Sequence, residues 1–416
     1  MATYDVGIGK IRVYLKPFNE DGTYQSDWTE ITKHVDIGSL GSITRGLDNT
    51  EYDLGILRTS NLGLGLMNQF GDYSDITVPK SIFKYKRSET QVKVTYQAAE
   101  DDNEPQCGIV ICGEFNIADE VTLFHGLLKD DATRMNVDTQ MIRFSVVGLE
   151  SLFSNEIVPI ASIANGDTMS AVMLDILNQT GITALLTVAA ANINPDQNVV
   201  IDDVSKLEGK TVREALNLLL PASNSILYID ENDTVIISGR DATVDVQFTF
   251  YGQASKTGIE NIQTILSVQS GIPRVFNYIL WADLTLSQDS GSITKYGTRK
   301  KDLNFEFITT VATKTTIGNA IRDEFKDPKQ EFDLVVPMEY RTLDLQVLDR
   351  LSIDYPTVFI PANDQDIPIC GEAVCGEAVL PFGLWHFSVD PDDHYFILGK
   401  RVNLRDRSIE FHVREI

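Results

Sequence analysis

The four cysteines of this chain are the residues whose type and spacing could most directly do chemistry. They form two pairs, Cys107 with Cys112 in "QCGIVICGEF" and Cys370 with Cys375 in "PICGEAVCGEAV". Thiolates bind zinc and iron–sulfur clusters, so a four-cysteine metal site is one interpretation. Structural zinc sites favour two residues between paired cysteines, whereas four separate them here. Local disulfides, or reduced thiols in a loop, are the alternatives, and the glycine after each cysteine indicates tight turning.

The rest of the sequence contains no focused catalytic constellation. It lacks the H-E-x-x-H, G-x-S-x-G and G-x-x-x-x-G-K-[ST] motifs of zinc proteases, serine hydrolases and nucleotide-binding loops. The stretch "DPDDHYF" gathers Asp390, Asp392, Asp393 and His394, but a solvated turn before a strand explains it better than a cation site. We therefore predict no catalytic residue and no cofactor, with zinc or an iron–sulfur cluster at the cysteines as the one metal alternative.

Hydrophobic periodicity predicts the elements that would position such groups. Alternating apolar residues predict strands over 91–97 and 142–148, and "SILYIDENDTVIISGR" predicts a hairpin over 225–240. Helical stripes appear in "DTMSAVMLDILNQTG", "TVREALNLLLP" and "TTIGNAIRDEFKDP", the second opening with a capping box from Thr211 to Glu214. The sequence thus predicts a mainly β protein with an α/β insert, an α+β fold.

An internal repeat explains the spacing of the cysteines. The order strand, acidic loop, C-G doublet and strand pair occurs twice, through "QVKVTYQ" and "CGIVICGE" and again through "DRLSIDYP" and "CGEAVCGE". Gly126 aligns with Gly399 in this comparison, and Phe144 with Phe411. We therefore predict two β-domains related by duplication, over 1–155 and 266–416, separated by an α/β insert over 156–265.

The net charge of the chain argues against one class of partner, the nucleic acids. The 416 residues carry a net charge of −25, which argues against specific nucleic-acid binding because phosphate neutralisation needs Lys and Arg. An acidic wall is still compatible with DNA passing by. The sequence shows neither a secretory signal nor an apolar run of about 20 residues, so we expect synthesis in the cytoplasm and no membrane insertion.

Several stretches, taken in order, resemble the hub proteins of phage tails and baseplates, of the late-control D-like kind. "WTEITKHVDIGSLGSITRGLD" and "YDLGILRTSNLGLGLMNQFGDYSD" resemble their opening, and "TLFHGLLKDDATRMNVDTQMIRFSVVGLESLF" resembles a hairpin of their first barrel. Their second barrel is resembled by "SITKYGTRKKDLNFEF" together with the helix and the strands that follow it. In those proteins this part begins with a strand around "YGTR". The α/β insert also matches in order, so the resemblance spans nearly the whole chain.

This resemblance implies two tube-like β-barrel domains per chain and a homotrimeric, pseudo-sixfold ring. Such a ring joins a sixfold tail tube to a threefold tip around the DNA channel. The implied partners are the tail tube protein, distal tail or baseplate proteins, the tape-measure protein, and a tip, spike or fibre protein. The implied location is the virion tail tip, and the implied role is structural rather than enzymatic.

Four apolar residues are candidates for contacts within that assembly. Ile109, Val110 and Ile111 form the tip of the first C-G hairpin, where exposure to water would be costly. Trp385 follows the second hairpin and could instead stack on a sugar. A receptor- or carbohydrate-binding tail module is therefore the alternative function, and a cell-envelope glycosidase is a further one that only unassigned acidic residues support.

Overall fold

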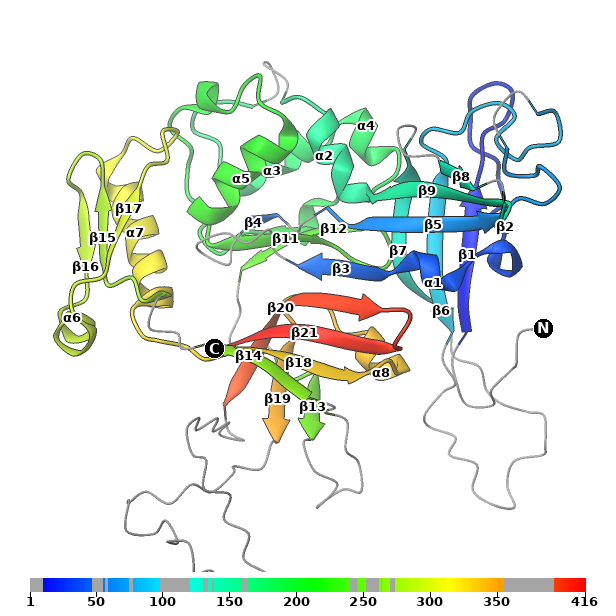
Figure 1. The fold of residues 1–416 in the computed structure, drawn as a ribbon. Coiled ribbons are helices and arrows are strands. Elements are labelled where there is room, and N and C mark those ends of the chain that lie inside the picture. The colour runs from blue at the N-terminus through cyan, green and yellow to red at the C-terminus, as the bar shows by residue number, and fades with distance from the viewer. Residues whose placement is uncertain are drawn as a thin grey trace, which may run out of the picture.

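The computed structural model describes residues 10–46, 55–56, 59–74, 78–97, 120–129, 134–136, 138–158, 163–239, 245–251, 262, 264–269, 274–354 and 393–416. This part of the chain is mainly β with a few helices, as the hydrophobic periodicity of the sequence predicts. Two curled seven-stranded sheets, a four-stranded sheet and a three-stranded sheet make up the fold (Figure 1). The first seven-stranded sheet lies at one end, and the three-stranded sheet lies at the other.

The first seven-stranded sheet has the order β2-β1-β6-β7-β9-β5, with β8 beside β9, and its pairings are antiparallel. Its strands are β1 (Lys10–Lys16), β2 (Thr29–Glu30), β5 (Asn61–Met67), β6 (Gln91–Gln97), β7 (Val121–Leu128), β8 (Arg134–Asn136) and β9 (Met141–Gly148). Val92, Val94 and Tyr96 are all buried, because alternate residues of a strand face the same side of the sheet. The strands expected over 91–97 and 142–148 are confirmed.

The second seven-stranded sheet has the order β13-β19-β20-β21-β18-β14, with β3 beside β20. Its strands are β3 (Ser42–Gly46), β13 (Phe248–Tyr251), β14 (Thr264–Gln269), β18 (Glu331–Pro337), β19 (Arg350–Asp354), β20 (His394–Asn403) and β21 (Ser408–Glu415). The strand β3 comes from the N-terminal part of the chain. It pairs with residues 399–403 of β20, and β19 pairs with residues 394–396 of the same strand.

The two sheets share a strand order. Four successive antiparallel strands lie as β6-β7-β9-β5 in the first sheet and as β19-β20-β21-β18 in the second. In each set the strand that comes first in the sequence lies beside the one that comes last: β5 beside β9, and β18 beside β21. In each set a long connection joins the second strand in the sequence to the third, β6 to β7 and β19 to β20. The residues 98–119 and 355–392 of these connections lie outside the described residues. The flanks differ, since β1 is antiparallel to β6 whereas β13 is parallel to β19.

Neither sheet closes on itself within the described residues, because the end strands of each order do not pair with each other. The curled sheets are therefore half-barrels in this structure. Two closed barrels, the duplication and the boundaries at 155 and 265 remain predictions.

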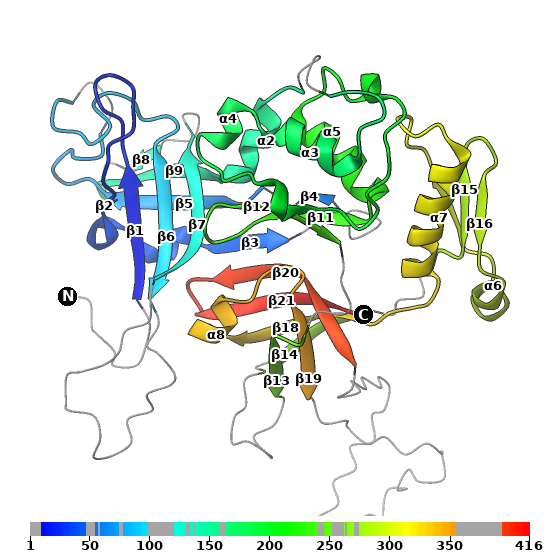
Figure 2. The ribbon, with the colours of Figure 1, turned by 180° about the vertical axis from the view of Figure 1, so that it is seen from behind.

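The α/β segment has a four-stranded sheet of order β10-β12-β11-β4, formed by β4 (Gly55–Ile56), β10 (Ile193–Asn194), β11 (Ser225–Ile229) and β12 (Val235–Gly239). Its helices are α2 (Leu152–Asn155), α3 (Met169–Leu177), α4 (Thr180–Thr183) and α5 (Val212–Ala222), and they lie on one side of that sheet (Figure 2). Both predicted helices form, and α5 has the predicted capping box, in which Thr211 and Glu214 cap each other's backbone N–H. The predicted hairpin is the pair β11–β12.

A separate three-stranded sheet, β16-β15-β17, is packed against the long helix α7. Its elements are β15 (Tyr278–Trp281), β16 (Leu286–Gln288), α6 (Ser290–Tyr296), β17 (Lys300–Leu303) and α7 (Val311–Phe325). The expectation of a strand around "YGTR" is wrong, because Asp289 caps the N-terminus of a short helix that ends at Gly297, whose φ is +74°. The third predicted helix is α7, and it begins at Val311, before the predicted stripe.

The remaining short helices are α1 (Ile37–Leu40), α8 (Tyr340–Leu343), and the 3-10 turns η1 (Thr32–His34), η2 (Leu149–Ser151), η3 (Ala190–Asn192) and η4 (Val204–Lys206). One hydrophobic core joins both seven-stranded sheets. A second core joins the α/β segment to the sheet β16-β15-β17 and α7. The expected third domain, 266–416, therefore contributes to both cores.

Candidate assembly surfaces

The site residues that the sequence suggested lie outside the described residues. This holds for Cys107, Cys112, Cys370 and Cys375, and also for Ile109, Val110, Ile111 and Trp385. Among the residues that the structure describes, no group of three or more His, Cys, Asp or Glu side chains could hold a metal ion. The metal and interface assignments of these eight residues remain predictions.

His394 and Asp393 are the described members of the acidic stretch before β20. The Nδ1 atom of His394 lies 2.6 Å from a guanidinium nitrogen of Arg350 on the neighbouring strand β19. This nitrogen accepts a hydrogen bond from a cation, so it is engaged within the sheet. His394 is the first residue of β20, as the predicted strand requires, whereas Asp390 and Asp392 lie outside the described residues and the choice between a turn and a cation site stays a prediction.

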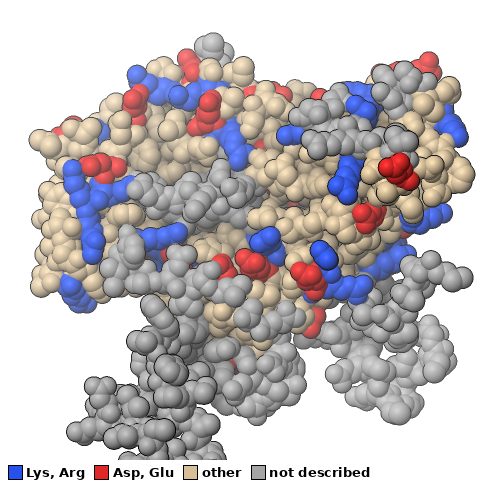
Figure 3. Space-filling model, in the orientation of Figure 1, with Lys and Arg blue, Asp and Glu red and all other residues tan. Residues whose placement is uncertain are grey.

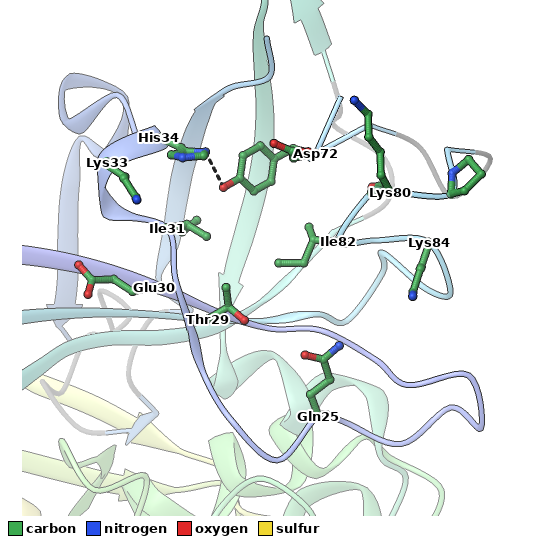
Figure 4. Close-up of a pocket in the computed structure, with 13 residues that line it drawn as sticks. Gln25, Thr29, Glu30, Ile31, Lys33, His34, Asp72, Lys80, Ile82 and Lys84 are labelled. Carbon is green, nitrogen blue, oxygen red and sulfur yellow. Dashed lines mark hydrogen bonds between the residues drawn. The ribbon is translucent and has the colours of Figure 1, made fainter. Parts of the chain in front are cut away.

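A groove beside β2 is a site that the sequence did not suggest. It has a volume of about 560 Å³, within the range of ordinary ligand clefts. One wall comes from β2 and η1, and the other from residues 72–73 and from the segment 79–84 (Figure 4). The residues around it are Gln25, Thr29, Glu30, Ile31, Lys33, His34, Asp72, Tyr73, Pro79, Lys80, Ser81, Ile82 and Lys84.

The buried part of this groove is apolar and held by one hydrogen bond. Ile31 and Tyr73 are 2% and 4% exposed, so they belong to the core of the first sheet as well as to the groove. The hydroxyl of Tyr73 lies 2.9 Å from Nδ1 of His34, and Figure 4 marks this bond. Burial, with a contribution from Asp72, raises the pKa of Tyr73 to about 12, so the phenol keeps its proton. The contact therefore links the two walls at neutral pH.

The rim of the groove is richer in cations than in anions. Lys33, Lys80 and Lys84 are exposed residues of the lining, against Glu30 and Asp72. Among the described residues, no ion pair involves any of these three lysines, and Lys84 instead lies 4.6 Å from the centre of the Tyr85 ring. A chain of net charge −25 thus carries a groove with a local positive excess.

The strand β2 leaves a free edge toward this groove. It ends the order of the first sheet, where Glu30 pairs with Tyr14 and Thr29 with Leu15. Ile31 donates its N–H to the carbonyl of Val13 at 2.8 Å. Because hydrogen-bonded and non-hydrogen-bonded pairs alternate in an antiparallel ladder, the N–H and C=O of Glu30 point away from β1. No strand in the described part of the chain pairs with them, so they can accept a further strand.

Exposed apolar side chains lie at several other places, of which two are the turn after β5 and the turn after β15. Met67, the last residue of the edge strand β5, is 44% exposed, and Phe70 after it is 72% exposed. Leu284, at the turn between β15 and β16, is 77% exposed and has a φ of +67°, which is rare for leucine. The described charges on the face in Figure 3 are interspersed, with Lys and Arg among Asp and Glu.

A buried ionic cluster connects the two cores. Glu331 of β18 lies 3.0 Å from Arg274 and 3.4 Å from Arg414 of β21. Arg414 also reaches Glu324 of α7 at 3.5 Å and lies 4.6 Å from the ring centre of Phe325. Since Glu331 and Arg414 are 2% and 3% exposed, this cluster fixes α7 against the second sheet.

Neither the groove nor the ionic cluster could be found by searching for motifs. Lys33 and Lys80 are far apart in the sequence, and no spacing rule relates them. The one available signal was the segment "VPKSIFKYK", in which lysines stand on either side of an apolar pair in an otherwise acidic chain.

No family model and no curated protein matches this sequence. The fold is similar to that of the tail protein from Neisseria meningitidis MC58, with a TM-score of 0.53 and 11% identity over 98% of this chain and 96% of that one. At this identity the similarity shows a shared fold.

Two further solved structures of tail proteins cover this chain at lower scores. The prophage MuSo2 tail protein from Shewanella oneidensis has a TM-score of 0.48 and 12% identity, over 97% of each chain. A prophage tail protein from Listeria monocytogenes EGD-e has a TM-score of 0.47 and 8% identity, over 97% of this chain and 94% of that one. The fold shared with the Neisseria meningitidis tail protein agrees with the resemblance found in the sequence. No helix among the described residues is long and apolar enough to cross a bilayer.

Proposed function

We propose that this chain is a structural hub protein of a phage tail tip. In this proposal three copies form a ring in which each chain contributes two sheet units, so that six similar units face the sixfold tail tube. The other side of the ring faces a threefold tip or spike. The ring surrounds the channel through which DNA leaves, and its role requires no catalytic residue and no cofactor.

The observation that carries this proposal is the repeated four-strand order within a fold shared with a tail protein. Two units of equal topology in one chain are what a threefold ring needs to present sixfold contacts. The open ends of both half-barrels also need partners, because exposed strand edges template further pairing. Neighbouring chains in a ring would supply a partner at one end of each half-barrel. Distal tail, baseplate and tape-measure proteins are the expected neighbours beyond the ring.

Light scattering on the purified chain tests the proposal. We expect a particle of three times the 46.3 kDa chain mass, either alone or after addition of the tail tube protein. Electron microscopy of that particle should show a ring with sixfold features on one face. A chain that remains monomeric with the tube protein present would contradict the ring. Zinc and iron measured on the same sample would decide the state of the cysteines, with no stoichiometric metal expected.

A further inference from the structure

We propose that the groove beside β2 binds an extended, acidic peptide segment of another protein, which adds a strand to the free edge of the first sheet. The proposal concerns the isolated chain and does not depend on the ring. Two features of the groove carry it, the free main-chain edge and the cationic rim, and the half-buried Ile82 adds apolar surface between them.

The free edge defines the conformation of the ligand. Glu30 presents one N–H and one C=O toward the groove, and the short strand β2 has no partner on that side among the described residues. Strand addition satisfies such groups by main-chain hydrogen bonds, while pockets for alternate side chains supply specificity. An extended segment fits this edge because it presents its own N–H and C=O at the same spacing.

The floor and the rim define the sequence of the ligand. Ile31 and Tyr73 are buried beneath the groove, and the half-buried Ile82 is the apolar side chain that an added strand would contact. Lys33, Lys80 and Lys84 surround that surface and favour carboxylates at the remaining positions. Figure 4 places Lys33 on one side of the groove and Lys80 and Lys84 on the other, so an acidic strand would lie between cations. The net charge of −25 makes a basic groove stand out against the rest of the chain.

The electrostatic part is tested with a fluorescein-labelled heptapeptide of sequence Asp-Val-Glu-Val-Asp-Val-Glu, measured by fluorescence anisotropy against the full chain. We expect saturable binding that is at least tenfold tighter than that of the charge-inverted peptide Lys-Val-Arg-Val-Lys-Val-Arg. The double variant Lys80→Glu with Lys84→Glu should weaken binding of the acidic peptide at least tenfold. The matched control is Lys206→Glu with Lys295→Glu, which reverses two exposed lysines elsewhere and should change binding less than twofold.

The main-chain part is tested at Glu30. Proline is tolerated on an edge strand where its missing N–H would face outward, so Glu30→Pro should retain the pairing of β2 with β1. It removes the donor to the added strand, and Glu30→Gln removes the same charge while keeping the donor. We expect Glu30→Pro to weaken the acidic peptide at least fivefold relative to Glu30→Gln, with the thermal midpoints of the two variants alike.

Absence of saturable binding, or equal affinity for the two peptides, would overturn the proposal. Unchanged affinity of the acidic peptide for the Lys80→Glu, Lys84→Glu variant would also overturn it. Equal binding by Glu30→Pro and Glu30→Gln would overturn strand addition. If the lysine variants instead abolish self-association in sedimentation, and no peptide binds, the occupant is a second copy of this chain and the acidic-peptide assignment is wrong.

Discussion

Replacing Glu331 by glutamine tests whether the buried ionic cluster holds α7 against the second sheet. The substitution keeps the shape of the side chain and removes its charge. Glu331 lies 3.0 Å from Arg274 and 3.4 Å from Arg414, so two cations lose a carboxylate. Arg414 is 3% exposed, and water cannot readily replace that partner.

The expected loss follows from this geometry. Removing one member of a buried ion pair costs about 3–5 kcal/mol, because the other charge is left without compensation. Arg414 keeps Glu324 at 3.5 Å, which limits the loss. We therefore expect the free energy of unfolding to fall by about 3 kcal/mol, at the lower end of that range.

Equilibrium urea unfolding measures this loss, and hydrogen exchange locates it in α7, β18 and β21. The matched control is Glu410→Gln, which breaks the Arg401–Glu410 pair on the same sheet. That pair is 3.8 Å long and its side chains are 52% and 35% exposed, so its loss should cost less than about 1 kcal/mol. If Glu331→Gln costs no more than Glu410→Gln, the reasoning about the cluster is refuted.

Three further predictions concern the rest of the fold. Gly126→Ala would place a Cβ 2.2 Å from the carbonyl oxygen of Val147, so thermal denaturation should show a loss of about 1–3 kcal/mol, and an unchanged midpoint would contradict the close approach. Thr211→Ala removes the N-cap of α5 and should cost about 1 kcal/mol in urea unfolding, which Thr211→Ser should largely restore. The hydrogen bond from Lys314, followed by those from Thr285, lowers the pKa of Asp283 from its ordinary 3.8 to about 2. The stabilisation that ionised Asp283 contributes is therefore present above about pH 4 and is lost as the pH falls toward 2. The thermal midpoint of Asp283→Asn should depend less on pH than that of the unchanged protein between about pH 4 and 2. Parallel profiles of the two proteins would count against this assignment.

Local signals in the sequence were sufficient for several elements. The capping box of α5 and the apolar stripe of α3 depend on residues within a few positions of each other, and both helices form as predicted. The strands β6 and β9 follow from alternation for the same reason. The helix α6 was missed because its signal is a single N-cap, Asp289, before a polar segment.

Contacts between distant segments could not be predicted in this way. The strand β3 pairs with β20 across more than 350 residues, and its sequence "SITRG" carries no mark of its partner. The groove depends on the same kind of contact, because His34 of η1 meets Tyr73 from a separate part of the chain. Local periodicity indicates which face of a strand is buried but not which strand lies beside it.

The pairing of β3 bears on how the proposed ring would be built. On one side, β20 pairs with β19 over residues 394–396 and with β3 over residues 399–403, so β3 covers an edge that β19 leaves open. A few residues later, β4 pairs with β11 of the α/β segment. One short stretch of the first unit is thus built into two other sheets, and the two seven-stranded sheets share a core. A partner that docks on the first sheet would therefore act on a body whose units cannot separate without breaking main-chain hydrogen bonds. The edges still open among the described residues, such as β2 and β14, are the ones left for other chains.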